Sequence, residues 1–249
     1  MALPSSLQLV HDAVQVWYAD LTAANIDTVD GFGVLDKDER ARASRLRVAE
    51  DRVEFIAAHV IARILIGQYL GQAPETISFG QIRNGKPFAI RTIGDSDLRF
   101  NAARTSGRAV FAFSIGREVG IDIERMTDHT HLSDAYGRAL TVREQAYLHA
   151  LPTERERRDA FFALWVRKEA VLKASGDGLA IAPDELDVMT ETARICVTGE
   201  TWRCWRFEGL TLDPACAAAV AAEGSGWRVA SVRSYTESLT GNSSVPASN

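Results

Sequence analysis

The segment 119–124, Val-Gly-Ile-Asp-Ile-Glu, constrains the fold more than any other stretch of this chain. Its apolar and polar residues alternate, which is the period of a β-strand with one covered face. Successive side chains of a strand point to opposite faces, so Val119 and Ile121 are expected to face a core while Asp122 and Glu124 project together. Two like charges on one strand face repel each other. Because Mg²⁺ is held by carboxylates together with substrate phosphates, this pair indicates a cation site.

A second segment, 161–173, has apolar residues at helical spacing and is followed by two glycines that act as stop signals. Glu169 and Lys173 are four residues apart, so they are neighbours on one helix face. By themselves they are most simply a surface ion pair. The functional interpretation has Glu169 completing a metal site with Asp122 and Glu124, and Lys173 contacting phosphate oxygens.

In these motifs the chain resembles the 4′-phosphopantetheinyl transferases, in particular the larger, surfactin-synthetase-activating type. The matching motifs are Gly-Ile-Asp-Ile-Glu at 120–124, Trp-x-x-Lys-Glu-Ala-x-x-Lys at 165–173, Gly-Lys-Pro at 85–87 and Phe-Asn at 100–101. They run in the family's order from about Leu35 to Ala222. The resemblance implies an α+β fold of two pseudo-symmetric α/β halves with the cofactor between them. We therefore expect halves at 1–117 and 118–235, followed by a Ser-, Asn- and Thr-rich, disordered tail at 236–249.

The resemblance implies transfer of the 4′-phosphopantetheine group from coenzyme A, the co-substrate, to a serine hydroxyl of an apo acyl or peptidyl carrier protein, with release of 3′,5′-ADP. Mg²⁺ held by the three carboxylates would neutralise and orient the pyrophosphate. The serine needs a general base, for which Glu169 is the first candidate and Glu144 the second. Lys173, supported more remotely by Lys168, would stabilise the charge that develops on the leaving phosphate.

The resemblance also places the nucleotide end of coenzyme A against the first half. Arg42 falls where the family has a basic residue on the 3′-phosphate, and Arg45, three residues later, could reach the same phosphate from the same helix face. The alternative for any one of these arginines is a solvated, mixed-charge helix face. The family's glycine-containing loop lies against adenine and ribose, and the matching residues here are Arg83, Gly85, Lys86 and Pro87.

One motif departs from the family pattern. Asn101 is followed by Ala102-Ala103-Arg104-Thr105, where the family has Ser-His soon after the Asn. Asn101, Arg104 and Thr105 are still expected to contact the cofactor, because the guanidinium of Arg offers a fork of donors suited to phosphate. Unlike His, however, Arg cannot shuttle a proton near neutral pH.

Composition sets the outer bounds. With 249 residues, 46% hydrophobic and 24% charged, the chain is long enough for one large domain or two small ones. A net charge of −5 argues against nucleic-acid binding. Three cysteines without CxxC spacing indicate neither a zinc site nor a disulfide framework. Reduced thiols and the lack of an evident signal sequence favour the cytoplasm, and no apolar run approaches the ~18 residues of a membrane helix.

We expect a monomer, from the two-half architecture. Carrier proteins are usually acidic, so an enzyme of net negative charge must meet them through a local patch, for which Arg138, Leu140, Val142 and Arg143 are candidates.

Outside the motifs, the sequence predicts a strand at Val14–Leu21 and a hairpin of 109–113 and 119–124 across Gly116. The alanine-rich run 215–222 favours a helix by propensity, but the resemblance makes it a strand. The other predicted elements are helices at 36–51, 55–70, 132–148 and 154–174, and strands at 77–79, 88–90, 98–100, 186–189, 194–197, 202–207 and 227–232.

Two other functions remain open from the sequence. The first is a non-catalytic relative that binds coenzyme A or a carrier protein, in which the change from Ser-His to Ala-Arg ended the chemistry. The second is a different magnesium-dependent phosphotransfer enzyme that uses another nucleotide. Binding without turnover would identify the first, and a substrate panel the second.

Overall fold

The computed structural model describes residues 7–22, 28–81, 87–90, 97–127, 132–176, 181–197 and 201–235. The helices are α1 (Thr28–Val34), α2 (Lys37–Arg45), α3 (Ala49–Leu70), α4 (Leu132–Ala139), α5 (Val142–Ala150) and α6 (Glu154–Ser175). The strands are β1 (Ala13–Asp20), β2 (Ser78–Gln81), β3 (Pro87–Ile90), β4 (Leu98–Thr105), β5 (Arg108–Ile115), β6 (Val119–Arg125), β7 (Thr192–Val197), β8 (Thr201–Leu210), β9 (Cys216–Glu223) and β10 (Arg228–Ser234).

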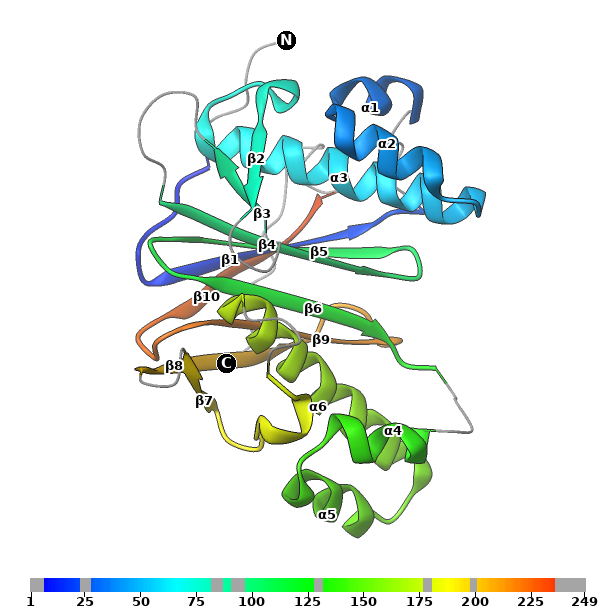
Figure 1. Cartoon of the computed structure of the whole chain (residues 1–249), viewed down its shortest axis with the longest axis vertical. Helices are drawn as coiled ribbons and strands as arrows, with labels where there is room; N and C mark the ends of the chain where they lie inside the picture. Colours follow the sequence, from blue (N-terminus) through cyan, green and yellow to red (C-terminus); the bar gives the residue numbers. More distant parts are fainter. Residues whose placement is uncertain are drawn as a thin grey trace.

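Two four-stranded sheets pack between two groups of helices (Figure 1). The first sheet has the order β10-β1-β5-β4 and packs against α3, whereas the second has the order β6-β9-β8-β7 and packs against α6. β2 and β3 form a separate two-stranded sheet. Each half therefore combines one four-stranded sheet with one 22-residue helix, which confirms the expected α+β fold of two similarly built halves.

β5 shows how the layers are joined. Ala109, Phe111 and Phe113 belong to the core between the first sheet and α3, while Val110 and Ala112 belong to the core between the two sheets. Strand side chains alternate between faces, so a continuous apolar run such as this one can only be a strand covered on both sides. Among the described residues, three cores are thus stacked on the two large sheets, and a fourth, smaller cluster around Leu35, Phe55 and Val60 lies between the helices of the first half.

β6 is held unusually close to α6. Val119 and Ile121 pack into the core between the sheets, which leaves Gly120 facing the helix. A Cβ on Gly120 would lie 2.1 Å from the backbone oxygen of Ala170 and 2.4 Å from the backbone nitrogen of Ala174. Only a residue without a side chain fits there, and this contact brings the carboxylate-bearing strand against α6.

The predicted hairpin between β5 and β6 is wrong. β5 pairs with β4 instead, through a turn in which Ser106 and Gly107 have φ values of 39° and 78°. Positive φ at both central residues is the property of a type I′ turn. After Gly116, at φ 63°, the chain leaves the first sheet, and β6 pairs with β9 in the second. The prediction failed because an alternating pattern identifies a strand but contains no information about which strand it pairs with.

β10 lies in the first sheet, although it comes last in the described chain. It pairs in parallel with β1, so Arg228–Ser234 belongs to the first sheet although the sequence assigned it to a second half of residues 118–235. The change of sheet falls between β5 and β6, near the expected division at residue 117. The tail 236–249 lies outside the described residues.

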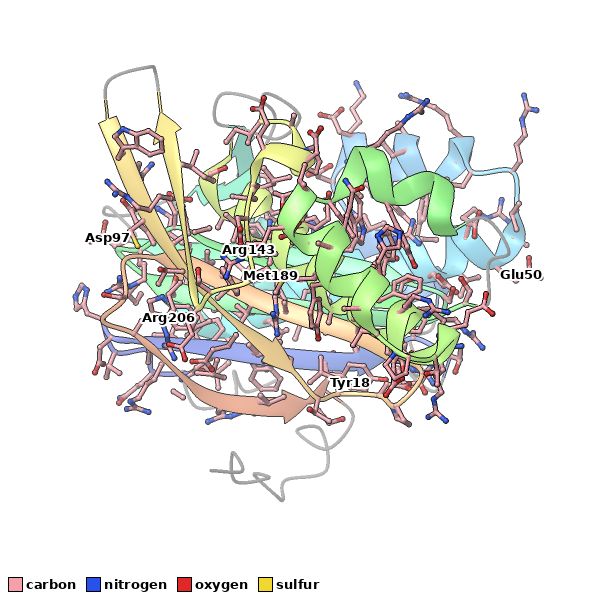
Figure 2. The ribbon with its side chains drawn as sticks, turned by 90° about the horizontal axis from the view of Figure 1, so that it is seen from below. Tyr18, Glu50, Asp97, Arg143, Met189 and Arg206 are labelled. Carbon is pink, nitrogen blue, oxygen red and sulfur yellow. The ribbon has the colours of Figure 1, made fainter. Side chains whose placement is uncertain are left out.

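The two halves are also tied at a polar contact. The hydroxyl of Tyr18 donates to Asp213 Oδ2 at 3.3 Å, and Arg108 Nε donates to the same oxygen at 2.9 Å. Tyr18 and Arg108 belong to β1 and β5, whereas Asp213 precedes β9 (Figure 2 labels Tyr18). This cluster joins the first sheet to a loop of the second.

Some predicted boundaries differ from the structure. The charged helix ends at Arg45, and α3 begins at Ala49 rather than near residue 55. The predicted strand at 186–189 is wrong, because a short 3₁₀ helix at Pro183–Glu185 is followed by irregular backbone. The strand at 215–222 is confirmed as β9, which lies between β6 and β8, where small side chains allow packing on both faces.

α3 is the one helix among the described residues that is long and apolar enough to cross a membrane by length and composition alone. This differs from the expectation that no segment approaches that length. In the structure, 61% of its most apolar window is buried inside the protein, where it covers the first sheet. Its hydropathy is therefore explained by its place in a core.

Candidate active site

Strand β6 and helix α6 bring the predicted metal and catalytic residues together. Asp122 is only 3% exposed, and its Oδ1 accepts a hydrogen bond from Lys173 Nζ at 2.6 Å. Its other oxygen, Oδ2, is buried and has no hydrogen-bond partner. A buried carboxylate oxygen without a partner is costly, so this atom is suited to receive a further positive group.

The three carboxylates also influence one another. Burial raises the pKa of Asp122, Glu124 and Glu169, and repulsion from Asp122 raises the pKa of the two glutamates further. Lys173 opposes these shifts at all three, and a hydrogen bond from the Trp165 side chain lowers the pKa of Glu124. The arrangement concentrates negative charge beside a single lysine.

The donor set fits a hard divalent cation, which takes carboxylate oxygens. The described residues nevertheless contain no group of three or more His, Cys, Asp or Glu side chains gathered in metal-binding geometry. The ion pair between Lys173 and Asp122 gives a reason, because the ammonium neutralises the carboxylate that would be the central ligand. The three carboxylates and the partnerless Oδ2 of Asp122 are suitable ligands for a cation. In this structure the positive group beside Asp122 is the ammonium of Lys173.

Two predicted site residues have a different role. Lys168 and Glu144 form an ion pair of 2.6 Å in which both side chains are 0% exposed. Lys168 Nζ also donates to the backbone oxygens of Pro183 and Leu186. Glu144 accepts from the backbone nitrogens of Thr141 and Val188, the first of these being part of the cap of α5.

Every donor and acceptor of this pair is thus engaged inside the protein. Burial lowers the pKa of Lys168, and the hydrogen bond with Glu144 opposes that shift. The structure therefore places Glu144, the predicted alternative general base, and Lys168, the predicted cofactor contact, in a buried ion pair and not in the cavity lining. The pair instead joins α6 to α5 and to the segment before β7.

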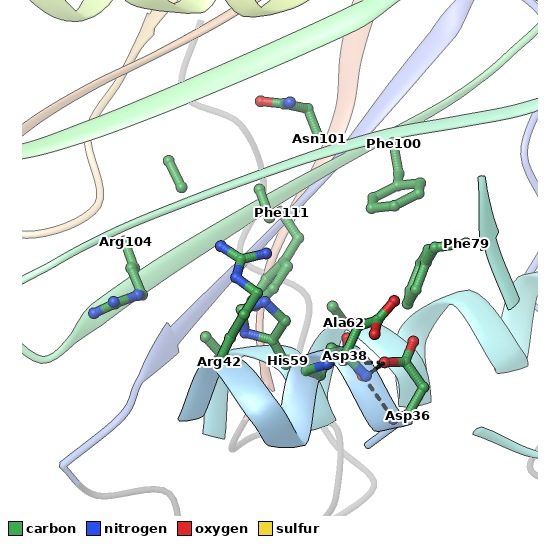
Figure 3. A pocket seen from close by; sticks show the side chains of 14 residues that line it. Asp36, Asp38, Arg42, His59, Ala62, Phe79, Phe100, Asn101, Arg104 and Phe111 are labelled. Carbon is green, nitrogen blue, oxygen red and sulfur yellow. Dashed lines mark hydrogen bonds between the residues drawn. The ribbon is translucent and has the colours of Figure 1, made fainter. Parts of the chain in front are cut away.

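A cavity of about 510 Å³ lies between α2, α3 and the first sheet (Figure 3). Arg104 and Asp36 stand at opposite sides of it in this view. Its lining comprises an aromatic part (Phe79, Phe100, Phe111), a basic part (Arg42, His59, Arg104) and an acidic part (Asp36, Asp38, Glu39). An aromatic surface next to guanidinium groups can accept a base together with a phosphate.

Arg42, one of the predicted phosphate contacts, is held by stacking. Its guanidinium carbon lies 5.4 Å from the ring centroid of Phe55, and that ring stacks on His59 at 3.8 Å. Burial lowers the pKa of His59 to about 4, and the charges of Arg42 and Arg104 act in the same direction. The imidazole is therefore neutral near pH 7, and the positive charge of this part of the cavity comes from the arginines.

Asn101 connects the cavity to the carboxylates. Asn101 is one of the residues that line the cavity, while its side chain points toward β6, where Oδ1 accepts a hydrogen bond from the backbone nitrogen of Ile121 at 3.0 Å (Figure 3). Ile121 directly precedes Asp122 on β6, so the two candidate subsites lie on the adjacent strands β4 and β6. Thr105, further along β4, accepts from the backbone nitrogen of Arg125 and is not part of the cavity lining.

The remaining predicted residues are placed less directly. Arg45 is exposed in the last turn of α2, outside the cavity lining. Arg83, Gly85 and Lys86 lie outside the described residues, and Pro87, the first residue of β3, pairs with Gln81 of β2.

Sequence reasoning missed His59, Phe79 and the acidic part of the cavity. The histidines of the sequence show no metal-ligand spacing, so His59 carries no signal of that kind. Its position one helical turn after Phe55 gives no signal of function without the packing of α2 on α3.

Comparisons with known proteins agree with these motifs. Residues 118–222 match the 4′-phosphopantetheinyl transferase superfamily. The chain is 34% identical over 228 residues to 4′-phosphopantetheinyl transferase HetI of Nostoc sp., covering 90% of this chain and 94% of that protein. It is 29% identical over 157 residues to a 4′-phosphopantetheinyl transferase of Bacillus subtilis, covering 63% and 67%.

Among solved structures, Thermotoga maritima holo-[acyl-carrier-protein] synthase matches 43% of this chain and 62% of its own, at 19% identity and a TM-score of 0.31. A score this low adds nothing to the assignment.

Proposed function

The chain belongs to the 4′-phosphopantetheinyl transferase superfamily, and we propose that it transfers the 4′-phosphopantetheine group from coenzyme A to a serine hydroxyl of an apo acyl or peptidyl carrier protein. The observation that carries this proposal at residue level is the packing of the β6 carboxylates against Glu169 and Lys173 of α6. We further assign it to the surfactin-synthetase-activating type, since one chain carries the motifs of both halves.

Asp122, Glu124 and Glu169 would hold a divalent cation, for which Mg²⁺ is the natural choice beside phosphate. When bound, the cation would supply neutralisation of the pyrophosphate charge. The partnerless Oδ2 of Asp122 and the raised pKa values of the three carboxylates support this use.

The protein's own groups account for the proton and the leaving group. Glu169, the carboxylate that α6 brings to the site, takes the proton of the serine hydroxyl. The serine oxygen then forms a bond to the β-phosphorus while the bond from that phosphorus to the bridging oxygen breaks. The electron pair leaves with 3′,5′-ADP, and Lys173, beside Asp122, donates to the developing charge.

The nucleotide end of coenzyme A would occupy the cavity. Arg42 is fixed on Phe55 and so loses little freedom when it binds a phosphate. Arg104 replaces the family's histidine at the cavity wall and can supply charge but no proton transfer. Proton transfer is accordingly left to Glu169.

Intact-mass spectrometry tests the function. An apo carrier protein is incubated with coenzyme A, Mg²⁺ and this protein, and a phosphopantetheine mass increment that disappears with EDTA is the expected result. No increment on acyl or peptidyl carriers, with coenzyme A still bound, would instead identify a non-catalytic relative.

A substitution of Asp122 tests the assignment of the three carboxylates to a cation. Asp122→Ala should abolish transfer but leave the fold intact, because it removes one charge from a repelling group. Asp159→Ala, an acid 41% exposed on the same α6 helix that carries Glu169, is the control and should transfer normally. A folded Asp122→Ala protein with unchanged turnover contradicts the assignment.

A further inference from the structure

We propose that Glu54 competes with a ligand phosphate for Arg104 and thereby weakens phosphate binding in the cavity. The inference rests on the proposed function for the identity of the ligand, a phosphorylated adenosine. It adds a specificity-determining residue that lies outside the cavity lining and the carboxylate site.

Arg104 stands between the cavity and Glu54. Its side chain comes from β4 and lines the cavity, while its NH1 atom lies 3.5 Å from Glu54 Oε2 on α3. The two side chains are 34% and 21% exposed. Glu54 does not line the cavity itself, so it acts on a ligand only through the guanidinium and through its own charge.

Few other charges are available to a phosphate at this end. His59 is half-buried and flanked by arginines, and its ring is engaged with Phe55 through both stacking and a contact from Nδ1 to the Phe55 oxygen at 2.8 Å. The guanidinium of Arg63 is fully buried and forms ion pairs with Asp36 Oδ2 at 2.6 Å and Glu39 Oε2 at 2.7 Å, so it is not available to a ligand. Arg42 and Arg104 therefore supply the positive charge of this part of the cavity, and Glu54 offsets part of it.

The ion pair between Arg104 and Glu54 is weak enough for a ligand phosphate to replace the carboxylate. An ion pair that is partly open to water contributes little stability, so a phosphate with several acceptor oxygens can displace the carboxylate. The displaced carboxylate stays close to the bound phosphate, and two like charges so near each other repel. Removing the charge of Glu54 without changing its shape should therefore strengthen phosphate binding.

Isothermal titration calorimetry with 3′,5′-ADP tests the inference. Glu54→Gln should lower the dissociation constant by about two- to fivefold, the range of a partly exposed ion pair. The gain should shrink in high salt, because screening weakens charge interactions near the surface. Adenosine, which lacks phosphate, should bind both proteins equally.

Two further variants make the result specific. Glu50→Gln removes an exposed carboxylate one turn earlier on α3, at the periphery of the molecule (Figure 2), and should leave the dissociation constant unchanged. In an Arg104→Ala background, Glu54→Gln should lose the part of its effect that comes from competition for Arg104 and keep only the relief of direct repulsion, so a gain as large as in the parent protein would contradict the competition.

Equal or weaker binding of 3′,5′-ADP by Glu54→Gln would overturn the inference, as would equal tightening of adenosine. These outcomes differ from failure of the proposed function itself, in which neither the parent protein nor any variant binds 3′,5′-ADP.

Discussion

Replacing Lys168 by Met tests whether this lysine of the Trp-x-x-Lys-Glu motif is structural. Lys168 is 0% exposed and its Nζ bonds to Glu144 and to the oxygens of Pro183 and Leu186. Met keeps the aliphatic stem but removes the charge and every one of these bonds.

The expected cost follows from what is left behind. Glu144 would remain fully buried without its counter-ion, and breaking a buried pair in this way costs about 3–5 kcal/mol. For a protein of about this size, each kcal/mol lowers the melting temperature by about 2–4 °C, so we expect a loss of roughly 6–20 °C. The double variant with Glu144→Gln should lose less than the single one, because no unpaired charge is buried.

Thermal unfolding followed by circular dichroism measures these losses. Arg155→Met is the matched control, since Arg155 lies on the same helix, is 83% exposed and pairs with Asp159 at only 3.7 Å, and it should melt close to the parent protein. If Lys168→Met melts within about 2 °C of the parent protein but has lost transfer activity, the structural role is refuted and a substrate contact is restored.

Three other perturbations follow from the site. Gly120→Ala should lower the free energy of unfolding by about 1–3 kcal/mol or more and lower kcat, because the added Cβ would lie 2.1 Å from the Ala170 oxygen and push α6 away from β6. A urea unfolding curve with an unchanged midpoint would contradict this. The folded-state pKa values of the three carboxylates are raised, so their contribution to the free energy of unfolding is fully present below the unfolded pKa values near 4 and is lost as the pH rises through the folded pKa values. Asp122→Asn should therefore raise the melting temperature of EDTA-treated protein at pH 7 and change it little at pH 4. A difference in melting temperature that does not depend on pH would contradict this. Asn101→Leu should cost about 1–3 kcal/mol by leaving the Ile121 nitrogen without its acceptor, and denaturation curves that overlay those of the parent would exclude that role.

Local pattern was sufficient for the elements that carry the catalytic motifs. Alternation over 119–124 placed Val119 and Ile121 in a core and Asp122 on the opposite face, as in β6. Helical spacing likewise put Glu169 and Lys173 on one side of α6. Both inferences succeed because the direction of a side chain depends on the backbone period of its own segment, which neighbours in sequence already reveal.

The α+β class and the strand and helix of the carboxylate site were thus predictable from residue patterns, and the strand character of β9 from family resemblance. The pairing of β10 with the first sheet, the burial of Lys168 against Glu144 and the position of Arg104 between a cavity and Glu54 were visible only once the chain was folded. Strand partners, ion pairs and burial depend on segments that are tens of residues apart in sequence. A lysine on an amphipathic helix has the same local pattern whether it meets solvent, substrate or a buried carboxylate.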